Sequence, residues 1–241
     1  MEAHHPHHVT HKKKWTEYLL EFFMLFLAVF LGFVAENIRE HSVENERMHS
    51  LAKSLLRDLQ NDTAQINFLE VNRLSSEKSL DSFYTFLHTP KEKIDRGEFY
   101  RLIRKIYGGL IFSQSRGTID QLRNAGYLRL FGDSLLHLLS DYDFNIQDYK
   151  MDEQVIVKWH DKFMERSVYL LNAESIDQMM QRAGYPEGTG INELTAESSK
   201  ELLSIIVMQR AVTKVMKAQN NNLKEKAARI IKYLHSSYHL E

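Results

Sequence analysis

Cysteine is absent from this 241-residue chain, and proline and glycine are scarce, with 3 and 10 residues. Without cysteine, a domain exported from the cytoplasm cannot use disulfides and must rely on packing between its elements. The shortage of proline and glycine, together with heptad-like spacing of apolar residues, argues for long helices and against a β-fold or a disordered stalk. The formal net charge of -1 provides no global field that would attract nucleic acid. These shortages favour an all-α protein.

The chain also lacks the short motifs of the common chemistries. It contains no H-E-x-x-H, phosphate-binding loop, dinucleotide fingerprint, G-x-S-x-G or EF-hand spacing. His160 and Asp161 are adjacent, but neighbours in a helix point in different directions and do not form a dyad. We therefore expect no enzyme activity, no cofactor and no metal site.

One apolar run stands out, from Trp15 to Ala35. Its last 18 residues, from Tyr18, include a single charged residue, Glu21. As an α-helix these residues span about 27 Å, close to the hydrocarbon thickness of a bilayer. Trp15 and Tyr18 would lie where aromatic side chains meet the lipid headgroups. Residues 15–35 are therefore predicted to be a single transmembrane helix.

Two other interpretations of this run fit less well. A cleaved signal peptide needs small residues at its cleavage site, whereas Phe33 stands two residues before Ala35. A buried helix of a soluble protein does not call for the basic flank Lys12–Lys14. Because these lysines precede the run and acidic residues predominate after it, the positive-inside rule predicts a cytoplasmic N-terminus. The rest of the chain would then lie in the periplasm, anchored in a bacterial inner membrane.

Small residues and one carboxylate recur on one side of the span. Glu21, Ala28 and Ala35 are seven residues apart, and Ala28 and Gly32 form a small-xxx-small pair. Such a pair lets another helix approach closely, so Glu21, Ala28, Gly32 and Ala35 are predicted to line a contact between membrane helices. Glu21 has two alternatives: it lies about 4.5 Å inside Tyr18 by helical rise and could reach headgroup water, or it could relay protons.

Residues 1–14 form a short tail with five of the chain's 12 histidines. Neutral imidazoles could bind a transition metal here. No fold fixes these ligands, which favours a short, mobile cytoplasmic tail without metal.

After the span, we expect a stalk helix over 36–88 and a helical-bundle domain over 89–241. Residues 37–68 contain neither glycine nor proline, and their apolar residues keep largely to one side. This helix should end near Leu87, before Thr89 and Pro90. Asp95 and Glu98 have capping-box spacing for a further helix through Tyr107, which two glycines should then end.

The clearest local signature lies over residues 117–131. Thr118 and Gln121 have the spacing of a capping box, and Gly126 fits the left-handed position after a short helix. A tight turn and an apolar link over 128–131 follow. Asp133 is then predicted to cap a long helix.

Two long helices complete the chain, each with a residue of one seam at every seventh position. A heptad repeat of this length requires a partner helix, so the two helices are expected to pack. A loop over 183–192 separates them, and Thr195 or Asn192 should cap the second. Gln209 and Gln219 could fix the register of the seam or lie at its edge. The first seam comprises Leu135, Tyr142, Tyr149, Ile156, Phe163 and Leu170, and the second Leu202, Gln209, Met216, Leu223 and Ile230.

Three segments form a recognisable combination: YLLEFFMLFLAVFLGFVAEN, LAKSLLRDLQNDT and TIDQLRNAGYLRLF. Glu21 and Asn37 bracket the first, Leu55, Leu59 and Asp62 mark the second, and Thr118, Leu122, Ala125, Gly126 and Leu128 mark the third. Over residues 12–150 this combination resembles an uncharacterised family of single-span envelope proteins from Bacteroidota. The resemblance implies a single-span topology and carries no activity with it.

These patterns together predict a single-pass membrane protein with a helical bundle outside the cytoplasm. We expect a non-catalytic scaffold or accessory subunit of a cell-envelope complex that forms homo-oligomers and binds an envelope partner. One alternative is a ligand sensor that relays to a partner protein, because the tail is too short to fold into an output domain. The other is a proton-coupled motor or transport subunit that uses Glu21.

Overall fold

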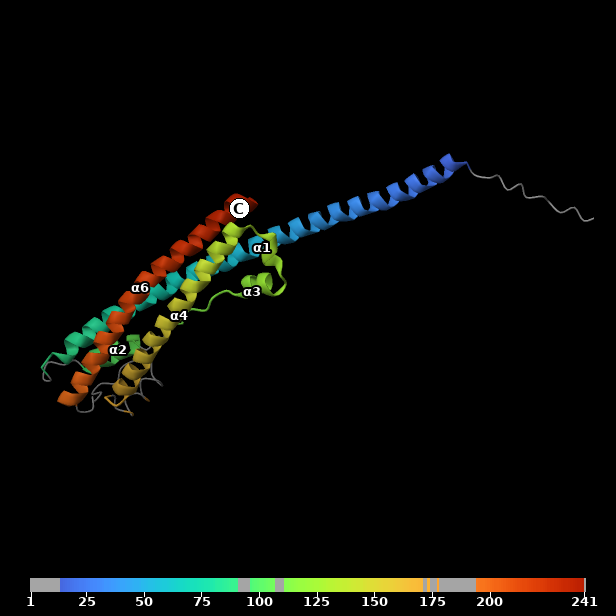
Figure 1. Cartoon of the computed structure of the whole chain (residues 1–241). Coiled ribbons are helices and arrows are strands. Elements are labelled where there is room, and N and C mark those ends of the chain that lie inside the picture. The colour runs from blue at the N-terminus through green and yellow to red at the C-terminus, as the bar shows by residue number, and fades with distance from the viewer. Residues whose placement is uncertain are drawn as a thin grey trace, which may run out of the picture. The chain divides into compact units, whose positions relative to one another are not determined.

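The computed structural model describes residues 14–90, 96–106, 111–170, 173, 177 and 194–240, and these residues form helices and no strand (Figure 1). The predicted all-α fold is therefore confirmed. The chain divides into two compact units, residues 1–50 and residues 51–241. Each unit is described by itself.

The first unit contains the start of helix α1, which runs from Trp15 to Leu87. Within the described residues, α1 is the one helix long and apolar enough to cross a membrane. None of its apolar window is buried by the rest of the chain. A helix that is apolar on every side needs an apolar surrounding, and a bilayer supplies one.

The second unit contains the rest of α1 and five further elements in the described residues. They are α2 (Arg96–Ile106), α3 (Gly117–Asn124), the 3-10 helix η2 (Tyr127–Leu130), α4 (Asp133–Val168) and α6 (Ala196–Tyr238). Helices α4 and α6 pack along each other, as their heptad seams predict (Figure 1). All members of both seams are buried except Ile156, which is partly exposed.

The second half of α1 belongs to this packed unit. Leu51, Leu55, Leu59, Ile66 and Leu69 are buried in it. These residues lie within the stalk helix predicted over 36–88, and the boundary between the two compact units falls inside that range, between residues 50 and 51. The physical reason is the one-sided apolar stripe, which is stable only when other helices cover it.

Several predicted helix ends can be compared with the structure. Helix α1 ends at Leu87, before Thr89 and Pro90, and the Thr195 side chain accepts a hydrogen bond from Ser198 N at the start of α6. Asp133 does not cap α4, because Gly132 is the N-cap residue and makes no side-chain bond. The carboxylate of Asp133 lies in the first turn, where it can still interact with the helix dipole.

Other predictions concern segments that the structure does not describe. These are the histidine-rich tail, the cap at Asp95, the glycines 108 and 109, the loop over 183–192 and the alternative cap Asn192. Helix α2 is described from Arg96 to Ile106, and Tyr107, where its end is predicted, lies outside the described residues.

Candidate functional site

The residues predicted to pack in the membrane share one exposed side of α1. Glu21, Ala28, Gly32 and Ala35 are all exposed in the single chain. A Cβ atom added at Gly32 would meet no atom within 4 Å. Another helix therefore has room to approach at Gly32, and the predicted contact between copies stays a prediction.

The opposite side of the same segment carries a column of aromatic rings. Phe22 stacks on Phe26 with 6.3 Å between ring centroids, and Phe26 on Phe30 with 6.0 Å. The segment thus has a small-residue side and a bulky side, a division that lipid alone does not require.

The predicted turn after α3 is present, but its capping box is not. Gly126 has a φ of +68°, the left-handed conformation predicted for it, and Ala125 N donates to the Gln121 carbonyl at 3.1 Å. Thr118 is not the N-cap residue. Helix α3 begins at Gly117, and its N-cap Arg116 has no side-chain cap. Gln121 therefore acts here through its backbone and not as the second member of a box.

Side chains of helix α1 accept hydrogen bonds from the backbone N–H groups around the start of α3, in place of the predicted capping box. We call residues 111–116, before α3, the strap. Ser115 N donates to Asp62 at 2.7 Å, Ser113 N to Gln65 at 2.8 Å, and Thr118 N, in the first turn of α3, to Asp58 at 3.1 Å. Asp58, Asp62 and Gln65 are spaced to share one face of α1. Tertiary contacts thus replace the local cap.

Asp62 is the most buried of these acceptors, with 2% of its surface exposed. It also accepts a 3.1 Å hydrogen bond from the Tyr142 hydroxyl of α4. Burial raises the pKa of Asp62, and the hydrogen bonds from Ser115 and Tyr142 oppose that rise. Burial also raises the pKa of Tyr142, helped by the charge of Asp62, so this phenol stays a hydrogen-bond donor.

A second buried polar group joins α1, α4 and the other end of the strap. Arg73 donates to the Tyr149 hydroxyl at 2.5 Å and to Glu153 Oε1 at 2.7 Å. Phe112 N of the strap donates to the same Glu153 oxygen at 2.9 Å. Burial raises the pKa of Glu153, against the opposing effects of Phe112 N and Arg73. The desolvation cost of burying Arg73 and Glu153 is therefore offset by hydrogen bonds as well as by the attraction of their opposite charges.

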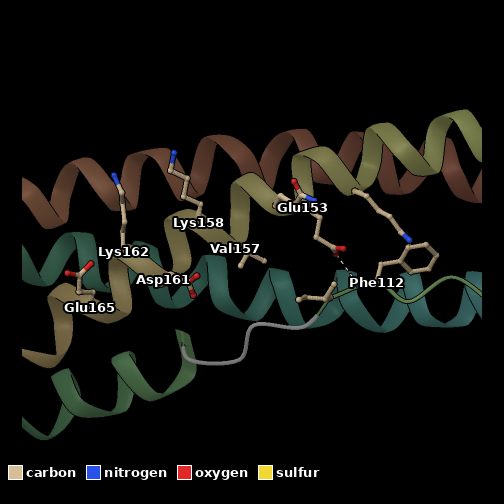
Figure 2. Close-up of a pocket in the computed structure, with 10 residues that line it drawn as sticks. Phe112, Glu153, Val157, Lys158, Asp161, Lys162 and Glu165 are labelled. Carbon is tan, nitrogen blue, oxygen red and sulfur yellow. Dashed lines mark hydrogen bonds between the residues drawn. The ribbon is translucent and has the colours of Figure 1, made fainter.

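A groove of about 650 Å³ runs along α4 beside Glu153. Figure 2 shows Glu153 directed toward Phe112, with further charged side chains of α4 along the groove. Its lining mixes three lysines and three carboxylates with the apolar side chains of Ile111, Phe112 and Val157. The full set is Ile111, Phe112, Lys150, Glu153, Gln154, Val157, Lys158, Asp161, Lys162 and Glu165.

The groove shows no arrangement that specifies a reaction. No group of three His, Cys, Asp or Glu residues within the described part of the chain could hold a metal ion. His160 does not line the groove, and burial lowers its pKa despite the neighbouring Asp161. The lining carries charged groups of both signs.

Sequence reasoning missed the strap, the Arg73–Glu153 pair and the groove. One signal was available for the strap: Asp58, Asp62 and Gln65 recur at helical spacing beside the apolar stripe of α1. Nothing comparable links Arg73 to Glu153, since 80 positions separate them.

Comparisons with known proteins add no assignment. No family model matches the chain, and no curated protein or solved structure matches it. The resemblance to single-span envelope proteins of Bacteroidota stays a prediction.

Proposed function

We propose that this protein is a membrane-anchored, non-catalytic scaffold that associates with copies of itself through residues 15–35 of α1. The observation that carries the proposal is the apolar helical segment of which nothing is buried within the chain. We place it in a bacterial inner membrane with its N-terminus in the cytoplasm, because Lys12–Lys14 precede the segment. An envelope protein partner is part of the same proposal.

Self-association is supported by the two unlike sides of the segment. Ala28 and Gly32 permit close backbone approach, and Phe22, Phe26 and Phe30 cover the other side toward lipid. Dispersion contacts at the small residues would supply most of the stabilisation. A protonated Glu21 could add a hydrogen bond, worth about 0.6–2 kcal/mol inside a membrane. The folded unit over 51–241 must contribute further contacts to a stable oligomer.

Disulfide trapping in native membranes tests the contact surface directly. The chain has no cysteine, so a single Ala28→Cys reports only on contacts at that position. We expect oxidant to crosslink Ala28→Cys into dimers, while the matched variant Phe26→Cys on the opposite side stays monomeric. Equal crosslinking of both variants, or none of either, would remove the proposed surface.

Two substitutions then separate packing from proton relay. Gly32→Ile places a branched side chain in the contact and should weaken association more than Glu21→Gln, which keeps a donor and an acceptor. Phe30→Ile introduces the same residue on the other side and should leave association unchanged. A proton relay predicts the reverse pattern, with Glu21→Gln abolishing function while the oligomer survives.

Ligand sensing is a second candidate, and the groove along α4 favours it. Its volume of about 650 Å³ lies in the usual range for small-molecule sites. Free amino acids and short peptides of mixed charge are suitable probes, because the lining carries both signs. A probe that raises the melting temperature of the native chain but not of Val157→Trp, which fills the groove, would support sensing. If every stabilising probe also stabilises Val157→Trp, the groove is not the site.

A further inference from the structure

Helices α4 and α6 carry exposed apolar side chains in addition to their buried seams. The four large ones, two on each helix, are 40–60% exposed. On each helix they and two alanines recur at intervals of three or four residues, the spacing of a side that another helix covers. We call the whole set the outer stripe, and it comprises Met151 and Val155 of α4 with Met208, Ala211, Val215 and Ala218 of α6.

The two parts of the outer stripe adjoin each other. One helical turn beyond the hydrogen bond from Gln219 to Asp152 are Val155 on α4 and Val215 on α6. Residue numbers rise along α4 as they fall along α6, so the two helices are antiparallel. The outer stripe is therefore one apolar patch that crosses both helices. The polar pairs that bridge the helices on this side are Asp141–Lys226, Asn145–Asn222 and Asp152–Gln219.

Charge of opposite sign is divided between the same two helices. Residues 141–153 of α4 contain five acidic residues and one lysine. The bridging pairs set this stretch level with residues 214–226 of α6, which contain four lysines and one glutamate. The two helices that form the patch thus attract each other along this stretch, and each repels a helix of its own kind.

A second copy of the chain matches both the apolar patch and the division of charge. A two-fold axis parallel to the two helices places α4 of each copy against α6 of the other and keeps every residue at its level. The apolar parts of the two stripes then meet, because they occupy the same level on both helices. The acidic stretch of α4 likewise meets the basic stretch of α6. Contact of α4 with α4 would instead place acidic residues beside acidic residues.

We propose that the outer stripe is a contact between two copies of this chain, with α4 of each copy packed against α6 of the other. The inference rests on the proposed self-association and deepens it, because it names the surface of the second unit that takes part. Every residue of the stripe lies in that unit, so this contact is distinct from the one proposed at Ala28 and Gly32. Covering the stripe removes apolar surface from water, which favours association.

Association of the full chain in detergent micelles, measured by energy transfer between separately labelled copies, tests the contact. Val215→Lys places a charge in the stripe and should raise the dissociation constant at least about tenfold. The matched control Val71→Lys makes the same change on α1, where Val71 is 67% exposed, and should leave the constant unchanged. Both side chains are exposed in the single chain, so both variants should keep the melting temperature of the parent. If Val215→Lys leaves the constant unchanged, or Val71→Lys raises it equally, the proposal is overturned.

Gly32→Ile separates this contact from the one proposed in the span. We expect each of Gly32→Ile and Val215→Lys to weaken association, and their combination to weaken it by about the product of the two factors. If Gly32→Ile abolishes association while Val215→Lys has no effect, the span contact stands and the stripe contact fails. The reverse result would remove the span contact and leave the stripe contact in place.

An exchange of charges tests which helices meet. Asp152 is seven residues after Asn145 and Lys214 is eight before Asn222, so across the axis each lies opposite the other in the second copy. Lys214→Asp places like charges there and should raise the dissociation constant at least about threefold, and adding Asp152→Lys should restore most of the loss.

The control for this exchange is Lys232→Asp, which makes the same charge change at an exposed position of α6 outside the stripe. Asp152→Lys should bring no recovery in the Lys232→Asp chain. If Asp152→Lys fails to restore association in the Lys214→Asp chain, or restores it equally in both chains, the arrangement of α4 against α6 is overturned.

Discussion

Arg73→Leu removes one partner of the buried ion pair in the second unit. In the structure, 13% of the Arg73 side chain and 4% of the Glu153 side chain are exposed. The substitution leaves the carboxylate of Glu153 buried with Phe112 N as its remaining hydrogen-bond donor. It also removes the donor that Arg73 provides to the Tyr149 hydroxyl.

The magnitude follows from the burial of the group left behind. Removing one member of a buried pair costs about 3–5 kcal/mol. Because Arg73 is partly exposed and water can enter in its place, we expect the lower end, about 3 kcal/mol of unfolding free energy at pH 7. In a Glu153→Gln background, Arg73→Leu should lower the free energy of unfolding by only about 1 kcal/mol, because no buried charge is then left without its partner. The coupling energy of the cycle is therefore about 2 kcal/mol.

The cost should also depend on pH. Burial raises the pKa of Glu153 above its ordinary value, and Arg73 opposes that rise. Loss of Arg73 raises this pKa further, so the folded state favours the protonated form more strongly. Below the unfolded pKa the carboxyl is neutral in both states, and little stability is lost. As pH rises through the raised folded pKa, ionisation becomes unfavourable in the folded state, so the variant loses stability toward neutral pH.

Urea unfolding followed by circular dichroism, at pH 4 and pH 7, measures both effects on residues 45–241. A cost for Arg73→Leu that is the same at both pH values and in the Glu153→Gln background would refute the reasoning. The Arg73–Glu153 contact would then contribute packing and not charge.

Three further predictions concern topology, autonomy and the turn. Protease added to right-side-out spheroplasts should digest the folded unit and protect the first residues; digestion of the tail instead, or a mature form lacking residues 1–35, would contradict the anchor. Residues 45–241 should be soluble and strongly helical by circular dichroism, because the seams of α4 and α6 pack within this part; an unfolded spectrum would mean that the anchor supplies the core. Gly126→Val should cost about 1 kcal/mol or more in urea unfolding, since its φ is positive. The control Gly117→Ala should cost less, because Gly117 has open space around it and no positive φ. Equal costs would show that the left-handed conformation of Gly126 does not account for the effect.

Much of the helical architecture follows from local patterns. The seam from Leu135 to Leu170 is buried, apart from the partly exposed Ile156, because a seventh-residue repeat is stable when it packs against another helix. Gly126 takes a left-handed φ because only glycine does so at little cost. Thr195 caps α6 because its side chain reaches backbone within its own turn. Each signal acts over one or two turns, so it survives whatever the tertiary fold does.

Caps and boundaries that compete with distant partners were less predictable. Thr118 and Gln121 have the spacing of a capping box, yet Asp58 and Asp62 of α1 supply the acceptors at the start of α3. Likewise, the apolar stripe of α1 predicts a one-sided helix, and only the structure shows that its residues from Leu51 are part of the core. A stripe shows that a face will be covered, but its period does not identify which helices cover it.

By itself, the sequence determined the helical class, the apolar segment that could span a membrane, the two packing seams and the turn at Gly126. Only the tertiary structure decided the strap, the Arg73–Glu153 pair and the groove. The reason is range: periodicity and capping act between neighbours on one helix. The Arg73–Glu153 pair depends on the 80-residue offset between α1 and α4, and that offset arises when whole helices pack.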